Sequence, residues 1–129
     1  MMMWEGIDKR RFPRIKHRCM IRVSGYGKEK VFDTFTENIG AGGICVVLDR
    51  EVDLFKNAKL ELYLTDKDSP ISCKGTIVWV IRRRLGSQGK AIEYDVGIEF
   101  IDISDMDRKR ISGLVDSLLG GELDNGIYA

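Results

Sequence analysis

Strict alternation of apolar and polar residues is the feature that most constrains this chain. Between Ile92 and Phe100 every second residue is apolar, and the residues between them are acidic or glycine. The same period of two runs through residues 19–23 and 60–65. Successive side chains of a β-strand point to opposite faces, so this pattern predicts strands with one buried face.

Three further β-rich segments, residues 31–36, 43–48 and 71–81, bring the predicted total to six strands. Short stretches rich in Gly, Ser, Asp and Pro separate these segments, as at residues 24–27 and 66–70. Six strands with short connections favour an antiparallel β-barrel, because closure removes the exposed strand edges.

One α-helix is predicted at the C-terminal end. Ser104 is a suitable N-cap, and acidic residues in the following turn complement the helix dipole. Apolar residues then recur at helical spacing as far as Leu118. The glycines at 120 and 121 are expected to end the helix. The predicted fold class is therefore all-β with one C-terminal α-helix.

Composition indicates a single soluble domain. The chain has 129 residues, of which 43% are hydrophobic and 32% charged. Three distant cysteines without a CxxC pair predict neither a disulfide framework nor a zinc site. The short apolar runs predict no membrane insertion, and the lack of a secretion signal favours the cytoplasm. We expect a flexible N-terminus over residues 1–8, a domain over 9–119 and a tail over 120–129.

The net charge of +1 conceals a strong asymmetry. Residues 1–30 carry nine basic and three acidic side chains, whereas the remaining 99 residues carry 12 basic and 17 acidic ones. A basic segment on a mildly acidic body indicates a discrete anion site and argues against DNA or RNA as the ligand. The arginines at 82, 83 and 84 either extend that anion surface or form a solvated hairpin end.

Three arginines of the basic segment lie within three residues of Pro13. A proline disfavours helix for the preceding residue, so Arg10, Arg11 and Arg14 are predicted to lie on an extended arm before the first strand. On such an arm Arg10 and Arg14 would lie about 13 Å apart, unless the arm bends. Guanidinium groups pair with phosphate oxygens and with guanine O6 and N7. A solvated basic tail explains the composition equally well.

The second informative segment runs from Asn38 to Gly43 and contains three glycines. These residues permit positive φ and close backbone approach, and exposed amides in such a turn can receive an anion. The Asn38 amide can donate to and accept from a base edge. Taken alone, the segment is more simply interpreted as a plain turn between strands. It is no P-loop, because no Gly-Lys-Ser/Thr follows.

Together the two segments resemble the PilZ domain family, which pairs an RxxxR motif with a later (D/N)xSxxG motif. The first motif appears here at residues 10–14, and the second has Asn38, Gly40 and Gly43 on its defining positions. The resemblance extends from residue 9 to about residue 119 and includes the closing helix. It implies a six-stranded antiparallel barrel with a C-terminal helix, acting as a bacterial receptor for cyclic di-GMP.

The resemblance also implies roles for individual residues. Arg10 and Arg14 would be the principal ligands of the phosphates and guanine, with Arg11 as an auxiliary ligand. Asn38 would bond to a guanine edge. Trp79 matches a position near the ligand more loosely, and a packing role on the barrel is equally well supported.

In the same comparison Gly40 and Gly43 would let the ligand lie against the barrel. Gly40 stands where the family motif has serine. One missing hydrogen bond costs roughly 0.5–1.5 kcal/mol, at most about tenfold in affinity. We therefore expect weakened binding, and a tighter complex in Gly40→Ser.

Enzyme chemistry finds little support in the sequence, since the single histidine, His17, has no adjacent Ser or Cys nucleophile and no carboxylate at the spacing of a catalytic triad or metal site. No cofactor or metal is predicted.

The predicted function is that of a single-domain cyclic di-GMP receptor or adaptor. Its arginine arm would close on the ligand and change a surface that binds a protein of the motility, pilus or exopolysaccharide machinery. The alternative is a degenerate PilZ domain that binds a protein without nucleotide. A barrel for single-stranded nucleic acid would need an exposed basic face with aromatic residues, which the acidic body opposes.

Overall fold

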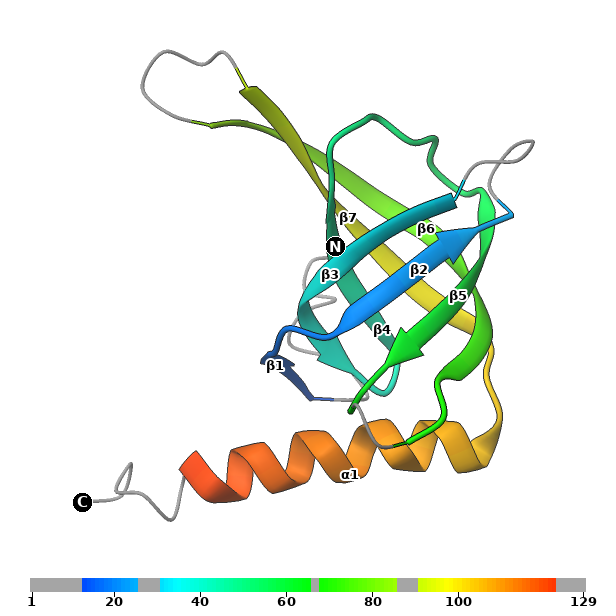
Figure 1. Cartoon of the computed structure of the whole chain (residues 1–129), viewed down its shortest axis with the longest axis vertical. Helices are drawn as coiled ribbons and strands as arrows, with labels where there is room; N and C mark the ends of the chain where they lie inside the picture. The colour runs from blue at the N-terminus through cyan, green and yellow to red at the C-terminus, as the bar shows by residue number, and fades with distance from the viewer. Residues whose placement is uncertain (1–12, 26–30, 66–67, 86–90, 123–129) are drawn as a thin grey trace, which may run out of the picture.

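The computed structural model describes residues 13–25, 31–65, 68–85 and 91–122. Within these ranges the elements are, in chain order, β1 (Arg14–Lys16), β2 (Met20–Ser24), β3 (Val31–Gly40), β4 (Gly43–Leu48), β5 (Asn57–Tyr63), β6 (Ile71–Leu85), β7 (Ala91–Asp102) and α1 (Asp105–Glu122). Neighbours in the sheet follow the order β1-β3-β2-β5-β6-β7-β4, and β4 also pairs with β3. That last pairing closes β2 to β7 into a barrel (Figure 1).

The predicted six-stranded antiparallel barrel and its closing helix are confirmed, and a short seventh strand is added. This strand, β1, pairs with the end of β3 so that Arg14 lies opposite Gly40 and Lys16 opposite Asn38. The sequence suggested that Arg14 belongs to an arm ahead of the first strand. Arg14 instead belongs to the sheet itself, because the end of β3 offers an edge with which its backbone can pair.

The chain between β1 and β2 is also bonded to β3. Thr36 is 2% exposed, and its hydroxyl accepts from the Cys19 N–H over 2.9 Å and donates to the His17 carbonyl over 2.7 Å. The Glu37 carbonyl accepts from the His17 N–H over 3.3 Å. These bonds hold the chain from β1 to β2 against β3, so the position of β1 is set by several contacts.

The expected turn between β3 and β4 is shorter than the sequence indicated. β3 continues to Gly40 and β4 begins at Gly43, so the turn consists of Ala41 and Gly42. Among the described glycines, the one with positive φ is Gly25, at 74°. The positive φ that the Asn38–Gly43 segment permits is therefore not used, whereas the close backbone approach is. The antiparallel register of β3 and β4 continues to their last residues and needs no left-handed backbone there.

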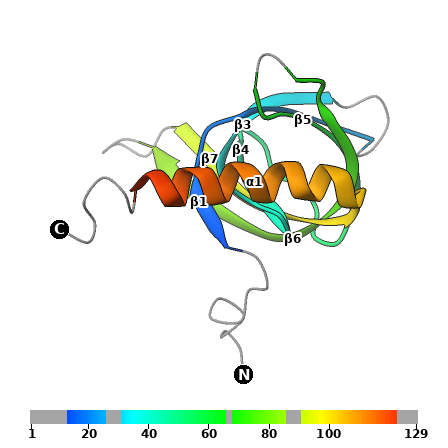
Figure 2. The same cartoon turned by 90° about the horizontal axis from the view of Figure 1, so that it is seen from below.

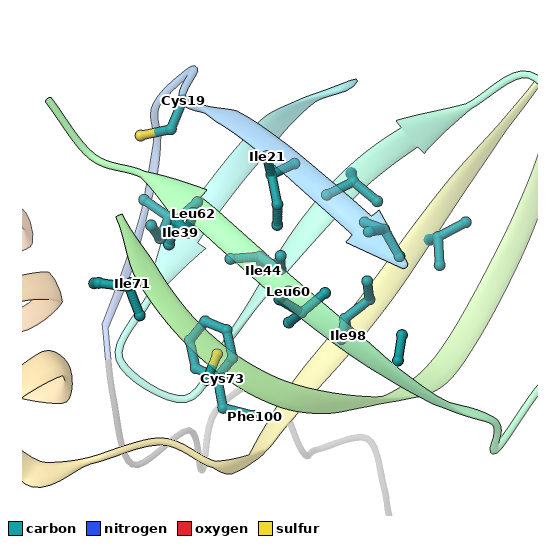
Figure 3. Close-up of a cluster of buried hydrophobic side chains, with 14 of the residues drawn as sticks. Cys19, Ile21, Ile39, Ile44, Leu60, Leu62, Ile71, Cys73, Ile98 and Phe100 are labelled. Carbon is teal, nitrogen blue, oxygen red and sulfur yellow. The ribbon is translucent and has the colours of Figure 1, made fainter. Parts of the chain in front are cut away.

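Alternation of side chains places the aliphatic residues inside the barrel (Figure 3). The largest fully buried side chains include Ile21, Ile39, Ile44, Leu62 and Ile98. The three cysteines are unpaired and buried, and burial raises the pKa of Cys45 to about 12 and of Cys73 to about 11. They therefore behave as small apolar side chains.

α1 crosses one open end of the barrel (Figures 1 and 2). Its buried side chains, Ile111 and Val115, are at most 1% exposed. The Ser104 hydroxyl accepts from the Asp107 N–H over 3.0 Å, which confirms the predicted N-cap. The predicted stop at the two glycines is wrong, because the helix passes through both and continues to Glu122. Glycine ends a helix where the chain turns left-handed, and Gly120 keeps a helical conformation.

Candidate functional site

The outer face of the barrel carries two rows of residues that include every predicted site residue within the described ranges. Strand pairing sets these rows, and an inward-facing row of isoleucines separates them. One outward row consists of Arg14, Gly40, Gly43 and Glu99. The other consists of Lys16, Asn38, Cys45, Gly97 and Trp79.

Arg14 and Asn38 join the two sequence motifs directly. The Arg14 Nη1 donates to the Asn38 Oδ1 over 3.2 Å, across a sequence separation of 24 residues. Arg14 lies opposite Gly40 in the register, so its side chain reaches diagonally along β3 to Asn38. The two short motifs therefore form one continuous surface.

Gly40 and Gly43 make room for this contact. A Cβ atom on Gly40 would lie 2.5 Å from the Pro13 carbonyl oxygen and 2.7 Å from the Arg14 Cγ. A Cβ atom on Gly43 would overlap the Ile98 carbonyl oxygen and lie 2.9 Å from the Arg14 Nη2. Both glycines are needed because backbone and the Arg14 side chain pass directly over them.

The close approach at Gly40 gives a new reason for the departure from the family motif. The sequence suggested the loss of a serine hydroxyl. The Pro13 carbonyl is backbone and cannot swing aside as a flexible side chain does, so a serine at this position requires β1 to move. Glycine at position 40 therefore suits the tight pairing of β1 with β3.

Trp79 lies at the far end of the second row. Its indole covers Gly97 so closely that a Cβ atom there would overlap the ring. Three strand spacings separate β6 from β3 through β7 and β4, which amounts to roughly 14 Å across the sheet. The structure thus gathers Arg14, Asn38 and the two glycines at one place and sets Trp79 apart on the same face. Arg10 and Arg11 lie outside the described residues.

A groove of about 500 Å³ opens beside Asn38. Its lining residues are Lys16, His17, Arg18, Thr36, Glu37 and Asn38. The Arg18 guanidinium lies 4.0 Å from the centre of the Phe35 ring. Lys16, which the sequence did not single out, lies directly opposite Asn38 and lines this groove. The spacing of two between Arg14 and Lys16 was the available signal, since it places both side chains on one face of a strand.

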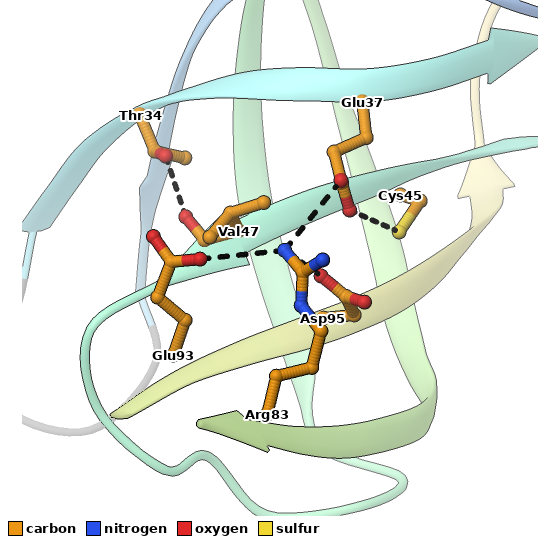
Figure 4. A network of polar contacts seen from close by, with 7 residues as sticks. All are labelled: Thr34, Glu37, Cys45, Val47, Arg83, Glu93 and Asp95. Atoms are coloured by element: carbon orange, nitrogen blue, oxygen red, sulfur yellow. Dashed lines mark hydrogen bonds and ion pairs between the residues drawn. The ribbon is translucent and has the colours of Figure 1, made fainter. Parts of the chain in front are cut away.

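An ion cluster borders this groove (Figure 4). The Arg83 Nη2 lies 3.1 Å from Asp95 Oδ1, 3.3 Å from Glu93 Oε1 and 3.7 Å from Glu37 Oε2. Burial raises the pKa of Glu37, the nearby Asp95 carboxylate raises it further, and Arg83 opposes both effects. The Arg83 side chain is 42% exposed, as expected for a solvated hairpin end, and the surrounding carboxylates oppose its use in an anion surface.

The described residues offer little for other kinds of site. They contain no cluster of three or more His, Cys, Asp or Glu residues suited to hold a metal ion. The one helix in these ranges lacks the apolar length that crossing a lipid bilayer requires.

Comparison with known proteins identifies the same architecture elsewhere. The model of the family described as PilZ domain matches residues 8–117. The PilZ domain of Escherichia coli YcgR, solved with c-di-GMP, superposes with a TM-score of 0.70 at 12% identity, covering 91% of this chain and 96% of that one. The MrkH–c-di-GMP complex from K. pneumonia gives a TM-score of 0.69 at 20% identity, covering 89% of this chain and 55% of that one.

The Bacillus subtilis inhibitor of motility, MotI/DgrA, gives a TM-score of 0.68 at 17% identity, covering 86% of this chain and 52% of that one. This chain thus spans about half the length of MotI/DgrA and of MrkH. No curated protein sequence matches the chain.

Proposed function

The chain belongs to the PilZ domain family, and on that basis we propose that it is a cyclic di-GMP receptor that acts as an adaptor and not as an enzyme. The YcgR and MrkH structures that share its fold are described with c-di-GMP bound. The same ligand class is consistent with the local charge of this chain, because a bis-phosphate ligand needs cations grouped at one place.

The Arg14–Asn38 contact is the observation that carries this proposal. Its hydrogen bond occupies the Asn38 Oδ1 and turns the amide nitrogen of Asn38 away from Arg14. An amide nitrogen is a donor, and the O6 and N7 atoms of guanine are acceptors on one edge. We propose that Arg14 binds a phosphate or a guanine face, while Asn38 donates to the guanine edge.

Gly40 and Gly43 bring backbone to the surface beside Arg14, and we propose that the ligand lies against this part of the barrel. Lys16 adds a second cation on the same strand, directly opposite Asn38 in the pairing of β1 with β3. Trp79 offers an indole face on the same row, on which a purine could stack. Arg10 and Arg11 are proposed as additional phosphate ligands from the chain before Pro13.

The proposed mechanism of signalling is closure of the arginine arm over the ligand. Arg14 already belongs to β1, so in this mechanism the closing part is the chain before Pro13. Phosphates would neutralise the arginines there and present a new surface to a downstream protein of the motility, pilus or exopolysaccharide machinery. The site of action proposed for such an adaptor is the cytoplasm.

Isothermal titration with cyclic di-GMP tests the proposal, with cyclic di-AMP as the matched control. The control has the same phosphate ring but lacks the guanine O6 acceptor. We expect heat with cyclic di-GMP and much weaker binding of cyclic di-AMP. In Asn38→Leu, which keeps the side-chain size, this discrimination is expected to fall by about tenfold.

Gly40, in place of the motif serine, favours a second candidate function. A PilZ domain that has lost its ligand would act as a protein-interaction module. No heat with cyclic di-GMP at protein concentrations that suit micromolar binding would support this candidate. Binding that persists unchanged in the double variant Arg10→Ala and Arg14→Ala would refute the proposed site.

A further inference from the structure

We propose that Arg108 of α1 is a positioning residue that holds the β3–β4 turn and, through it, the surface around Arg14. The inference rests on the proposed ligand function but concerns a residue outside the ligand surface. The Arg108 Nη1 donates to the Ala41 carbonyl over 2.9 Å, across 67 residues of sequence. This contact connects the helix to the two-residue turn between Gly40 and Gly43.

Both carbonyl groups of this turn are held by specific donors. Arg108 bonds the Ala41 carbonyl, and the Phe100 N–H donates to the Gly42 carbonyl over 3.0 Å. In a trans peptide the carbonyl and the following N–H point in opposite directions. Holding the Ala41 and Gly42 carbonyls therefore also sets the directions of the Gly42 and Gly43 amides, which belong to the glycine-rich segment.

Of the two donors just named, Arg108 is the one that acts through its side chain. Truncation of Arg108 would therefore leave the Ala41 carbonyl without this donor. Ala41 is 2% exposed, so water has little access to replace the donor at its backbone. Left-handed glycine geometry does not lock the turn either, since Gly42 has no positive φ. The side chain from α1 is therefore a principal restraint on the orientation of the Ala41–Gly42 peptide.

Arg108 can act as a restraint because its own backbone is anchored. Its N–H donates to the Ser104 carbonyl over 2.9 Å in the first turn of α1, which the Ser104 side chain also caps. Ile111, one turn later, is fully buried against the barrel. The guanidinium thus projects from a part of the helix that the barrel holds in place.

Displacement of the turn would reach the ligand surface through the two glycines that flank it. Gly40 abuts the Pro13 carbonyl and Gly43 abuts the Arg14 side chain, each with no room for an added Cβ atom. Contacts this tight cannot absorb a shift without moving Arg14. Arg14 in turn bonds Asn38, so loss of Arg108 is expected to disturb both proposed ligand residues.

A pair of helix variants provides a matched test. Arg110 lies on the same helix and donates to the Ser69 carbonyl over 2.6 Å, so it makes the same kind of contact with a different loop. Arg108→Met and Arg110→Met each remove one positive charge and a bond to a carbonyl, and Arg110→Met also removes the 3.3 Å ion pair with Asp107. In titrations of the full chain with cyclic di-GMP, we expect Arg108→Met to raise Kd five- to tenfold and Arg110→Met less than twofold. Arg108→Lys, which keeps a donor and the charge, should recover most of the loss.

Amide hydrogen exchange measured by NMR without ligand separates this inference from the proposed function. We expect Gly42 and Gly43 to exchange at least fivefold faster in Arg108→Met and at the wild-type rate in Arg110→Met. If the wild-type protein gives no heat with cyclic di-GMP, the proposed function fails and exchange alone decides the positioning role. Exchange and Kd within twofold of wild type in Arg108→Met, or equal changes in both variants, would overturn the inference.

Discussion

Arg14 and Arg83 both lie on the outer face of the barrel, yet their surroundings differ in kind. Three carboxylates lie 3.1 to 3.7 Å from the Arg83 guanidinium. The contacts described for Arg14 are with an amide oxygen and with two glycines that leave room for it. Carboxylates surround the charge of Arg83, whereas the Arg14 side chain lies over two glycines and donates to the Asn38 amide.

The two regions also act in opposite directions on an anion. The cluster of Glu37, Glu93 and Asp95 outnumbers its single guanidinium, so its net charge is negative when the carboxylates are ionised. Glu37 precedes Asn38 in sequence and lines the same groove. An anionic ligand is therefore expected to avoid the Arg83 side and to settle toward Arg14 and Lys16. The number of arginines in a segment of the sequence therefore does not by itself tell where an anion binds, because neighbouring carboxylates can cancel their charge.

The largest expected effect is on cyclic di-GMP affinity, when Arg14 and Arg83 are each replaced by methionine in separate variants. Arg14→Met should weaken cyclic di-GMP binding about 10- to 150-fold, since hydrogen bonds to charged groups contribute roughly 1.5–3 kcal/mol. Arg83→Met should change Kd less than about threefold, because salt screens a charge that makes no contact with the ligand. Titration calorimetry on both variants checks this, and similar losses in the two would remove the distinction.

The glycine beside Arg14 provides the second test. Gly40→Ser is expected to lower the free energy of unfolding by about 1–3 kcal/mol through overpacking against Pro13. Gly113→Ala is the matched control, since a Cβ there meets nothing within 4 Å, and in a helix it should add about 0.5–1 kcal/mol. Urea unfolding measures both. A Gly40→Ser protein of wild-type stability that binds cyclic di-GMP more tightly would instead support the missing-hydroxyl explanation.

Arg83 itself should matter mainly for stability. Arg83→Met is expected to cost about 1 kcal/mol near pH 7, as is typical of a partly exposed ion network. Without the guanidinium the three carboxylates repel one another, and protonation relieves that repulsion. The stability difference from wild type should therefore shrink as the pH falls toward 4. A pH-independent difference in urea midpoints would mean that Arg83 stabilises through packing alone.

The smallest expected effect is that of Glu37→Gln. Because the folded-state pKa of Glu37 is raised, the native state binds more protons than the unfolded state between the two pKa values. Stability of the wild type therefore falls as the pH rises through this window, starting near the ordinary glutamate value of about 4.3. Glu37→Gln removes this loss, so its advantage should grow toward neutral pH to about 0.5 kcal/mol. An advantage that grows toward acidic pH would contradict the stated direction.

Much of the fold followed from local patterns. Alternation along residues 92–100 predicted β7, and the Ser104 cap predicted the start of α1, because both signals depend on neighbours within a few residues. The prediction that α1 ends at the two glycines was wrong, because the local preference of glycine does not by itself decide where a helix ends. The family resemblance implied ligand roles for Arg14 and Asn38, and the structure brings the two side chains into contact.

The sequence by itself determined a barrel with one buried face per strand, a capped helix and a basic segment beside a glycine-rich one. Tertiary structure alone decided which groups the arginines contact. It placed Arg14 against Asn38, surrounded Arg83 with carboxylates and brought Arg108 to Ala41. The physical reason is that alternation and capping act over a few bonds of chain. Contacts that an arginine side chain makes with a group 24 or 67 residues away depend on strand register and on how the helix packs across the barrel.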